Sequence, residues 1–436
     1  MTGEIPAAEP KKDLDELIAQ FEEVARKRPT PAELAEAERT GAQVQHEEPP
    51  EPEPAGLPIE PSEPAGLPIE PPKPAELPIA PPEPAELPIS PAEPAVVSVA
   101  PPEPAPGAPA LAVVESIEQW WAAGERVEVG LSSGARYAIF VRVIGQGPWM
   151  TMLHGFPTSS WDWAPIAGAV ASKYRLLTLD LLGFGDSDKP SGHDFSAFEQ
   201  ADIVEALWRH LDVAETRLVG HDVGMTVALE LLARQDEGKL ATRMTDLTLL
   251  NGGVYAAHHR PRAIQVWLQR PLIGGFIARR MSEGRFARGF AEIFAPEHQP
   301  TADEFHQHWL SVARRDGFKN YHRLIKYIPE RRANARRWEG AVENSATPIR
   351  FVWGMVDPVS GAHMATAIKE RRRSADFVEL PDVGHYPQLE APDRVAAAII
   401  DGPLRGADGP LHGADGSPGG ADGSPGGAER PRAAGK

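Results

Sequence analysis

Short apolar runs alternate with stretches of helical spacing through the middle of the chain. The runs are rich in aliphatic and β-branched residues, which is typical of buried strands. They occupy residues 149–153, 175–181, 216–220, 246–253, 348–355 and 375–380. Apolar, helix-forming residues follow such runs, for example at 225–233. This alternation predicts an α/β fold with a mostly parallel sheet that helices cover on both faces.

Two further features extend the predicted core at its amino-terminal side. Residues 125–130 and 135–144 have strand-like sequences and precede the alternating region, so we expect an antiparallel hairpin. Ser196 and Glu199 have the spacing of a capping box, which predicts the start of a helix that reaches Leu211.

The alternation stops over residues 254–346, where Arg, Trp and Phe recur with helical spacing, and it resumes at Pro348. An insertion at this place predicts a helical cap over a site at the end of the sheet. The segment has 16 Lys and Arg against 9 Asp and Glu. A solvated helical surface accounts for this excess, because no nucleic-acid-binding module accompanies it.

Both ends of the chain differ from the middle in composition. Residues 1–110 hold 22 acidic and 7 basic residues, and 49–109 contain 23 prolines in a ten-residue repeat. Proline at this density predicts an extended, disordered spacer. The repeated Leu-Pro-Ile triplets also suit an aromatic groove, so tail-mediated protein contacts stay open. Residues 13–28 place apolar residues on one helical face and predict a short helix. This helix either docks on another surface or belongs to a disordered tail that is only marginally helical.

The chain is therefore predicted to contain five segments. They are an acidic Pro-rich disordered tail with short helices (1–110), the first part of the core (111–253), a helical cap (254–346), the second part of the core (347–402) and a Gly-rich disordered tail (403–436). We also expect the acidic tail to fold back on the basic cap in a salt-sensitive way.

Residues 220–224 read Gly-His-Asp-Val-Gly and lie where a predicted strand turns into a helix. This is the nucleophile-elbow pattern with Asp222 in place of serine. A carboxylate at such a turn can attack an alkyl carbon and form an ester, which water must then cleave. Taken alone, the pentapeptide favours an ordinary polar turn, so the interpretation depends on the other motifs.

Two further candidate residues follow later strands. Asp357 comes at the end of the run 348–355, and His385 lies in the loop after 375–380. The order Asp222, Asp357, His385 is that of the nucleophile, acid and histidine in α/β-type hydrolases. Asp357 would orient His385, and His385 would activate the hydrolytic water. Separately, Asp357 is typical of a turn and His385 of a loop histidine.

A His-Gly-Phe-Pro turn begins at His154, directly after the run 149–153. In folds of this kind the amides after the His-Gly pair and after the nucleophile form an oxyanion hole, which here predicts Phe156 and Val223. A simple strand-terminating turn is the alternative. The Gly-rich stretch 183–190 lacks the ending of a phosphate-binding loop and is predicted to be a tight structural turn.

Taken together, these motifs resemble the α/β-hydrolase group of epoxide hydrolases and haloalkane dehalogenases. Longer strings, HGFPTSSWDW, LLGFGDSDKP, NGG followed by HRP, and HYPQLE, resemble the mesoderm-specific-transcript type in particular. The likeness covers roughly residues 145–400. It implies an α/β-hydrolase fold with a helical cap, an Asp nucleophile and no cofactor. Val223 and Phe156 stand where dehalogenases typically have Trp and Asn halide donors, and Val223 also replaces the carboxylate-binding arginine of fluoroacetate dehalogenases.

Epoxide opening in this group uses tyrosines of the cap as acids, because a phenol can protonate the ring oxygen as the C–O bond breaks. The candidates here are Tyr327, Tyr321 and Tyr255, and the first two are preferred. Together with His154 they are the predicted substrate-binding residues. Each tyrosine alone is more often a packed aromatic residue than an acid.

The resulting prediction is a cofactor-independent hydrolase that acts on a small hydrophobic molecule, most plausibly an epoxide. Dehalogenation is the alternative in the same class, and a catalytically weak scaffold that binds other proteins is the alternative outside it. The chain has no cysteine, no plausible metal cluster and no apolar run of transmembrane length. Its N-terminus lacks a signal-peptide layout, so a cytoplasmic location is expected.

Overall fold

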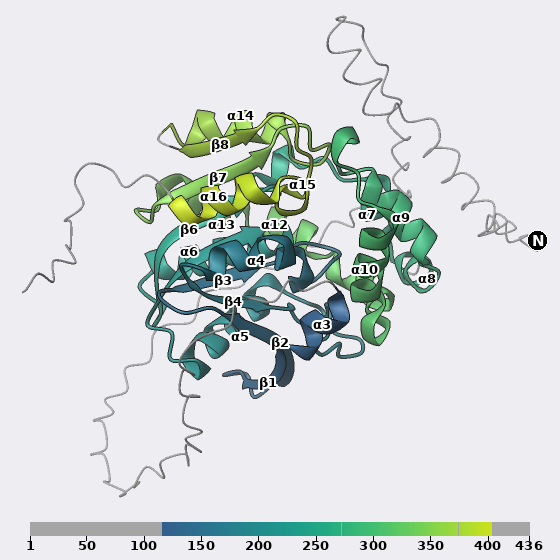
Figure 1. Ribbon diagram of the computed structural model, residues 1–436, viewed down its shortest axis with the longest axis horizontal. Helices are drawn as coiled ribbons and strands as arrows, with labels where there is room; N and C mark the ends of the chain where they lie inside the picture. The colour runs from purple at the N-terminus through teal and green to yellow at the C-terminus, as the bar shows by residue number, and fades with distance from the viewer. Residues whose placement is uncertain (1–115, 272, 374, 403–436) are drawn as a thin grey trace, which may run out of the picture. The chain divides into compact units, whose positions relative to one another are not determined.

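The computed structural model describes residues 116–271, 273–373 and 375–402 (Figure 1). The predicted Pro-rich and Gly-rich tails, and the helix expected at 13–28, lie outside these residues. The predicted contact between the acidic tail and the basic cap lies outside them as well.

One eight-stranded sheet organises the described residues (Figure 1). Its strands, in chain order, are β1 (Glu125–Gly130), β2 (Arg136–Ile144), β3 (Trp149–Leu153), β4 (Arg175–Leu179), β5 (Glu215–His221), β6 (Arg243–Leu250), β7 (Ile349–Gly354) and β8 (Asp376–Leu380). Their spatial order is β1-β2-β4-β3-β5-β6-β7-β8. The pairs β1–β2 and β2–β4 are antiparallel and the others are parallel. The predicted hairpin and mostly parallel sheet are therefore confirmed.

Helices cover both faces of the sheet because successive strand residues point to opposite sides and both sides are apolar. In β7, for example, Phe351 belongs to one apolar cluster and Val352 to the other. The helices α4 (Ala164–Ala171) and α16 (Pro392–Asp401) bury their apolar faces in the cluster with Val352. The other cluster includes α5 (Ala197–His210), α6 (Val223–Asp236), α13 (Ala335–Asn344) and α14 (Ala362–Arg371).

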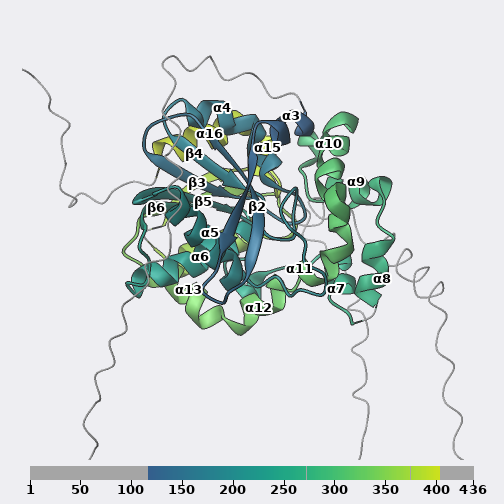
Figure 2. The same ribbon diagram turned by 90° about the horizontal axis from the view of Figure 1, so that it is seen from below.

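Between β6 and α13 the described residues form only helices and their connections. We call residues 254–334 the helical insert. Its elements are η2 (Ala256–His258), α7 (Ala263–Leu268), α8 (Ile273–Arg279), α9 (Glu283–Ala291), η3 (Pro296–His298), α10 (Ala302–Ala313), η4 (Arg314–Asn320), α11 (Tyr321–Leu324) and α12 (Tyr327–Ala333). Figure 2 shows α7, α8, α9 and α10 grouped to one side of the sheet.

The last helix of the predicted cap, α13, packs on α6, so we end the helical insert before it. Trp338 of α13 donates its Nε1 hydrogen to Glu230 of α6 at 2.8 Å, and Arg337 donates to the same carboxylate at 2.7 Å. A buried carboxylate needs such donors, so these contacts hold α13 to the core face of the sheet.

The predicted capping box of α5 is wrong in its second member. Ser196 does cap the helix, since its Oγ accepts from Phe198 N–H. Glu199 instead accepts from Tyr137 Oη at 2.8 Å. The carboxylate at this helix start is that of Glu330 in α12, which accepts from Ser196 Oγ at 2.5 Å and from Ala197 N–H at 2.9 Å. A side chain distant in sequence thus satisfies the free amide of the helix end.

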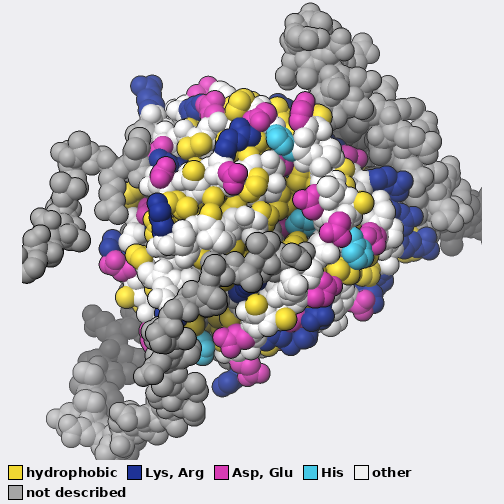
Figure 3. Space-filling model, viewed as in Figure 1, with side chains coloured by type: hydrophobic (Ala, Val, Ile, Leu, Met, Phe, Trp, Pro, Cys, Tyr) yellow, Lys and Arg dark blue, Asp and Glu magenta, His cyan; other side chains and the backbone are white. Residues whose placement is uncertain are grey.

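Exposed basic residues gather on α8 and α9, on the right of Figure 3. They are Arg279, Arg280, Arg285 and Arg288. No helix among the described residues is long and apolar enough to cross a membrane. The cytoplasmic location stays a prediction.

Candidate active site

Asp222 lies at a strained turn between β5 and α6, with φ 44° and ψ −104°. Such a conformation costs a non-glycine residue about 1–3 kcal/mol, and the packing around it must supply that energy. Flanking glycines permit the turn. A Cβ on Gly224 would lie 2.3 Å from Leu153 O, and one on Gly220 would lie 2.9 Å from Met225 Cα. The structure therefore has the backbone geometry that the elbow motif predicts.

Asp357 and His385 reach this turn from the loops after β7 and β8. His385 Nδ1 lies 2.8 Å from Asp357 Oδ2, and both side chains are buried. The Asp357 carboxylate also accepts from Val359 N–H at 2.7 Å, from Ser360 Oγ at 2.6 Å and from Asn251 Nδ2 at 2.9 Å. These bonds fix the carboxylate, and through it the orientation of the imidazole.

The electrostatics of the pair favour the charged form of both members. Burial opposes a charge on His385, but the neighbouring Asp357 carboxylate and the charge of Asp222 outweigh it and raise the pKa of His385 to about 9. Burial likewise opposes the charge of Asp357, while His385 and the donors around the carboxylate hold its pKa below the usual value. The imidazole is thus protonated at neutral pH.

The amide of Phe156 faces the candidate nucleophile. It donates to Asp222 Oδ2 at 3.1 Å, and Tyr386 Oη holds the same residue by donating to Phe156 O at 2.8 Å. Val223 is the first residue of α6, directly after Asp222. No hydrogen bond from Val223 N–H to the carboxylate is present among the described residues. One of the two predicted oxyanion donors thus contacts Asp222 in this state.

Tyr327 lies opposite the nucleophile at the start of α12. Its hydroxyl is 3.2 Å from both carboxylate oxygens of Asp222. Burial and the charge of Asp222 raise the pKa of Tyr327 well above its usual value, so the phenol keeps its proton. A tyrosine hydroxyl from the insert thus faces the Asp222 carboxylate.

The other predicted substrate-binding residues lie elsewhere. Tyr321 donates to Pro157 O at 3.0 Å and packs on the Phe156 ring, so its hydroxyl supports the oxyanion turn. Tyr255 packs against Arg371, whose Cζ is 4.1 Å from its ring. His154 uses both ring nitrogens within the core. Its Nε2 accepts from Leu181 N–H at 3.0 Å, and its Nδ1 contacts Gly155 O.

Neither His154 nor Tyr255 makes a hydrogen bond with Asp222 among the described residues, and their substrate-binding roles stay predictions. Both nitrogens of the His154 imidazole hold backbone groups. Tyr255 has the guanidinium of Arg371 as its neighbour and makes no contact with Asp222 that meets hydrogen-bond criteria.

Three residues that sequence reasoning missed support the site. His221 Nε2 donates to His385 O at 2.8 Å while its Nδ1 accepts from Gln388 Nε2 at 3.2 Å. Burial and the charge of His385 lower the pKa of His221 to about 3, so it is neutral. Asn251, directly after β6, links that strand to β7, since its Oδ1 accepts from Gly354 N–H. Arg331 of α12 binds Thr226 Oγ1 on α6. The elbow histidine and the Asn-Gly-Gly after β6 were visible signals, but their partners were not.

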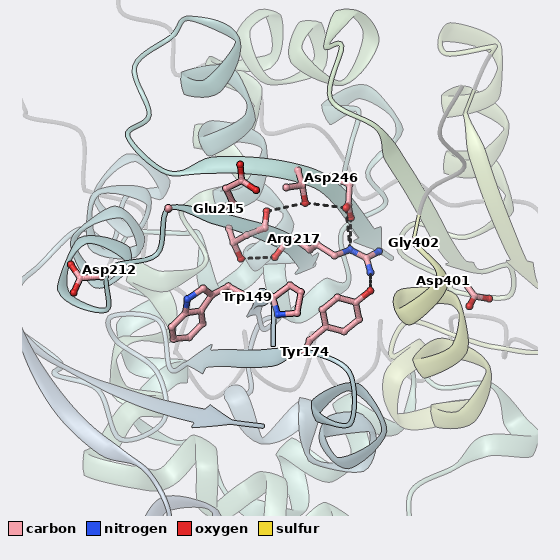
Figure 4. Close-up of a pocket in the computed structure, with 12 residues that line it drawn as sticks. Trp149, Tyr174, Asp212, Glu215, Arg217, Asp246, Asp401 and Gly402 are labelled. Atoms are coloured by element: carbon pink, nitrogen blue, oxygen red, sulfur yellow. Dashed lines mark hydrogen bonds and ion pairs between the residues drawn. The ribbon is translucent and has the colours of Figure 1, made fainter. Parts of the chain in front are cut away.

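No group of three or more His, Cys, Asp or Glu that could hold a metal ion exists within the described part of the chain. A separate hollow of about 560 Å³ lies at the other end of the strands (Figure 4). It is lined at the amino ends of β3, β5 and β6, where Arg217 pairs with Asp246 and contacts Tyr174 Oη. The candidate catalytic residues do not line this hollow.

Comparison with known proteins defines the class. The family model of the alpha/beta hydrolase fold matches residues 148–392. The chain belongs to the α/β-hydrolase family, as the motifs and the sheet indicate.

Its relatives fall within the expected group. The chain is 39% identical over 286 residues to the putative hydrolase LipZ of Mycobacterium tuberculosis. The aligned region covers 65% of this chain and 97% of LipZ. It is 38% identical over 264 residues to the mesoderm-specific transcript protein of Mus musculus. Here the aligned region covers 59% of this chain and 78% of that protein. The predicted resemblance to the mesoderm-specific-transcript type is confirmed.

The fold has solved counterparts. The epoxide hydrolase CorEH superposes with a TM-score of 0.53 at 18% sequence identity, over 64% of this chain and 98% of that one. At this level of identity the likeness establishes the fold alone. Fold and relatives together identify a hydrolase.

Proposed function

We propose that this protein is a cofactor-independent hydrolase that opens epoxides through an ester on Asp222. The observation that carries the proposal is the environment of the Asp222 carboxylate. Phe156 N–H donates to one of its oxygens, and the Tyr327 hydroxyl faces both. A carboxylate on a strained turn with an acid 3.2 Å away suits an attack on carbon coupled to protonation of the departing oxygen.

In the first step an Asp222 oxygen forms a bond to an epoxide carbon. The ring C–O bond breaks, its electron pair stays on the ring oxygen, and that oxygen takes the proton of Tyr327 Oη. The raised pKa of Tyr327 means that the resulting tyrosinate is a strong base, and it takes up, through solvent, the proton that His385 releases before the ester is cleaved. The product of this step is a neutral hydroxyalkyl ester of Asp222.

In the second step water cleaves the ester. Formation of the ester removes the charge of Asp222, which is one of the causes that raise the pKa of His385. The imidazole therefore loses its proton more readily in the intermediate than in the free enzyme. Neutral His385, oriented by Asp357, then takes a proton from water as the water oxygen attacks the ester carbonyl. Phe156 N–H stabilises the oxyanion. As the bond between the carbonyl carbon and the diol oxygen breaks, His385 gives its proton to that oxygen and the diol is released. The Asp222 carboxylic acid then passes its proton to His385 and becomes a carboxylate again.

The test is to trap the ester. Full-length His385→Gln is incubated with styrene oxide, and the protein is digested and analysed by mass spectrometry. We expect one added epoxide mass on the peptide with Asp222, and no accumulation on the wild type. An adduct on another residue, or undiminished turnover by Asp222→Asn, would overturn the assignment.

Dehalogenation uses the same nucleophile and is the second candidate. Phe156 and Val223 offer no side-chain N–H to a leaving halide, which favours epoxides. A halide-release assay with 1-bromobutane separates the two reactions. Absence of any Asp222-dependent turnover with epoxides, haloalkanes and esters would favour a scaffold that binds other proteins.

A further inference from the structure

Two buried polar side chains near the nucleophile have nitrogens without a hydrogen-bond partner among the described residues. Arg331 of α12 is 2% exposed, and its Nη1 has no partner. His259, which follows η2, is 8% exposed, and neither of its ring nitrogens has one. Buried polar groups are normally paired, because each unpaired one costs about 1–3 kcal/mol. Arg331 Nη1 and the ring nitrogens of His259 are therefore free to bind polar groups of another molecule.

The unpaired nitrogens converge on one point. A Cβ built on Gly253 would lie 1.9 Å from Arg331 Nη1 and 3.2 Å from His259 Nδ1. Gly253 follows β6, and its lack of a side chain lets the guanidinium approach the loop with His259 beside it. The place is close to the nucleophile, since a Cβ on the neighbouring Gly252 would lie 3.0 Å from Asp222 Cα.

The remaining contacts of Arg331 fix its position without neutralising it. Its Nε and Nη2 donate to Thr226 Oγ1 at 3.2 and 2.5 Å, and its Nη2 lies 3.5 Å from Asp222 O. Burial lowers the pKa of Arg331, and the negative charge of Asp222 opposes that shift. Asp222 is thus a counter-charge for the guanidinium, although the two form no direct ion pair.

His259 complements the guanidinium as a neutral group. Burial, together with the positive charges of Arg331 and His385, lowers the pKa of His259 to about 3. A neutral imidazole keeps one N–H donor and adds no charge. Arg331 Nη1 and His259 together therefore offer a charged and a neutral donor, a combination that suits an oxyanion with two acceptor oxygens.

Ester formation changes the charge balance around Arg331. Asp222 becomes neutral when it is alkylated, and once the Tyr327 phenolate has regained its proton the buried guanidinium lacks both of these negative neighbours. A negative group on the substrate restores the balance in the intermediate, where an uncompensated buried charge would be most costly. This favours a substrate that brings its own negative charge.

We propose that Arg331 Nη1 and His259 bind a carboxylate of the substrate, so that the enzyme acts on small molecules with a carboxylate near the electrophilic carbon, such as epoxy acids. The inference rests on the proposed function for the reaction, but the binding site can be tested without it. It narrows the predicted hydrophobic substrate to one with an anionic end.

The first experiment measures binding with unreactive probes. Full-length protein is titrated with trans-cinnamate and with trans-cinnamamide by calorimetry. We expect the wild type to bind cinnamate about 10–100-fold more tightly, as a charge-assisted pair would, and Arg331→Met to lose most of this preference. Arg332→Met is the matched control, because Arg332 is the adjacent residue and is exposed. Equal binding of both probes by the wild type would overturn the proposal.

The second experiment compares reaction rates. We expect kcat/KM of the wild type to be higher for trans-3-phenylglycidate than for trans-β-methylstyrene oxide, and Arg331→Met to lose at least 10-fold more on the acid than on the neutral epoxide. An equal loss on both would show that Arg331 acts only through Asp222, and would overturn the proposal. If Arg331→Met does not fold, His259→Phe carries the same comparison, with a smaller expected loss.

The two experiments separate the two claims. Preferential binding of cinnamate by the wild type, lost in Arg331→Met, supports the carboxylate site even if no epoxide is turned over, and in that case the proposed reaction fails by itself. Turnover of neutral epoxides without any preference for cinnamate supports the reaction and overturns the carboxylate site. A water molecule between Arg331 and His259 would give this second result.

Discussion

The two halves of the candidate site are built differently. The sheet supplies Asp222, Asp357 and His385 from loops at the carboxyl ends of three strands, and backbone geometry or several hydrogen bonds fix each one. The helical insert supplies Tyr327 and Arg331 from one face of a single helix, α12. In the proposed mechanism the sheet therefore supplies the groups that make and cleave the ester, while the insert supplies the groups that protonate and hold the substrate.

Removal of the proposed nucleophile from the sheet half should have the largest effect on activity. Asp222→Ala eliminates the group that forms the ester, so we expect kcat/KM for styrene oxide to fall by about 10⁴-fold. Steady-state kinetics on full-length protein checks this value, with the thermal unfolding midpoint as a control for folding. A loss below tenfold would place the chemistry outside the sheet half.

A substitution in the backbone turn around Asp222 should have the next largest effect, on the free energy of unfolding. Gly224→Ala places a methyl group 2.3 Å from Leu153 O and 2.5 Å from His154 O, so we expect a loss of about 3 kcal/mol in unfolding free energy. Gly168→Ala in α4 is the matched control, because its Cβ meets no atom within 4 Å. That change should be neutral or stabilise the protein by about 0.5–1 kcal/mol. Urea unfolding of both variants measures the difference, and equal stability would contradict the tight elbow.

The acid from the insert should matter less than the nucleophile. Tyr327→Phe removes the hydroxyl beside Asp222 while keeping the ring, so we expect kcat for epoxide opening to fall by about 10²-fold. Tyr321→Phe should lose under about tenfold, because its hydroxyl donates to Pro157 O. A reversed order of these two losses would move the acid role to Tyr321.

The smallest expected effect is on stability against pH. The pKa of His385 is raised from 6.5 to about 9 in the folded protein. Its contribution to stability is therefore complete below about pH 6.5 and is lost as pH rises through 9. We expect a decrease on the order of 2 kcal/mol across this window. Urea unfolding from pH 6 to 10 measures it, and His385→Gln should lack this part of the decrease.

The sheet half could be predicted from the sequence, and the insert half only in part. The elbow, the order of Asp222, Asp357 and His385, and the strands that carry them depend on local patterns that sequence shows directly. Arg331 is one of 16 basic residues in a helical segment, and no periodicity tells which of them is buried. The prediction of the carboxylate that caps α5 failed for the same reason, since Glu330 lies 134 positions from Ser196.

His154 shows a different limit of prediction from sequence, because its position could be predicted but its contacts could not. Its place in the His-Gly-Phe-Pro turn was predicted correctly, but its substrate-binding role stays a prediction, because a motif does not show which side of the turn a ring faces. Leu181 N–H and Gly155 O occupy its two nitrogens. Position in a motif is thus a weaker guide than the acceptors and donors that surround a side chain.

The anchoring of α12 has a consequence for how substrate enters. Glu330 ties the middle of this helix to the first turn of α5, and Arg331 ties it to α6. If the insert swings outward to admit a molecule, α12 should stay with the sheet while α7–α10 travel. The entrance would then open while Tyr327 on α12 keeps its position beside Asp222. Substrate binding would therefore not require this pair to form anew.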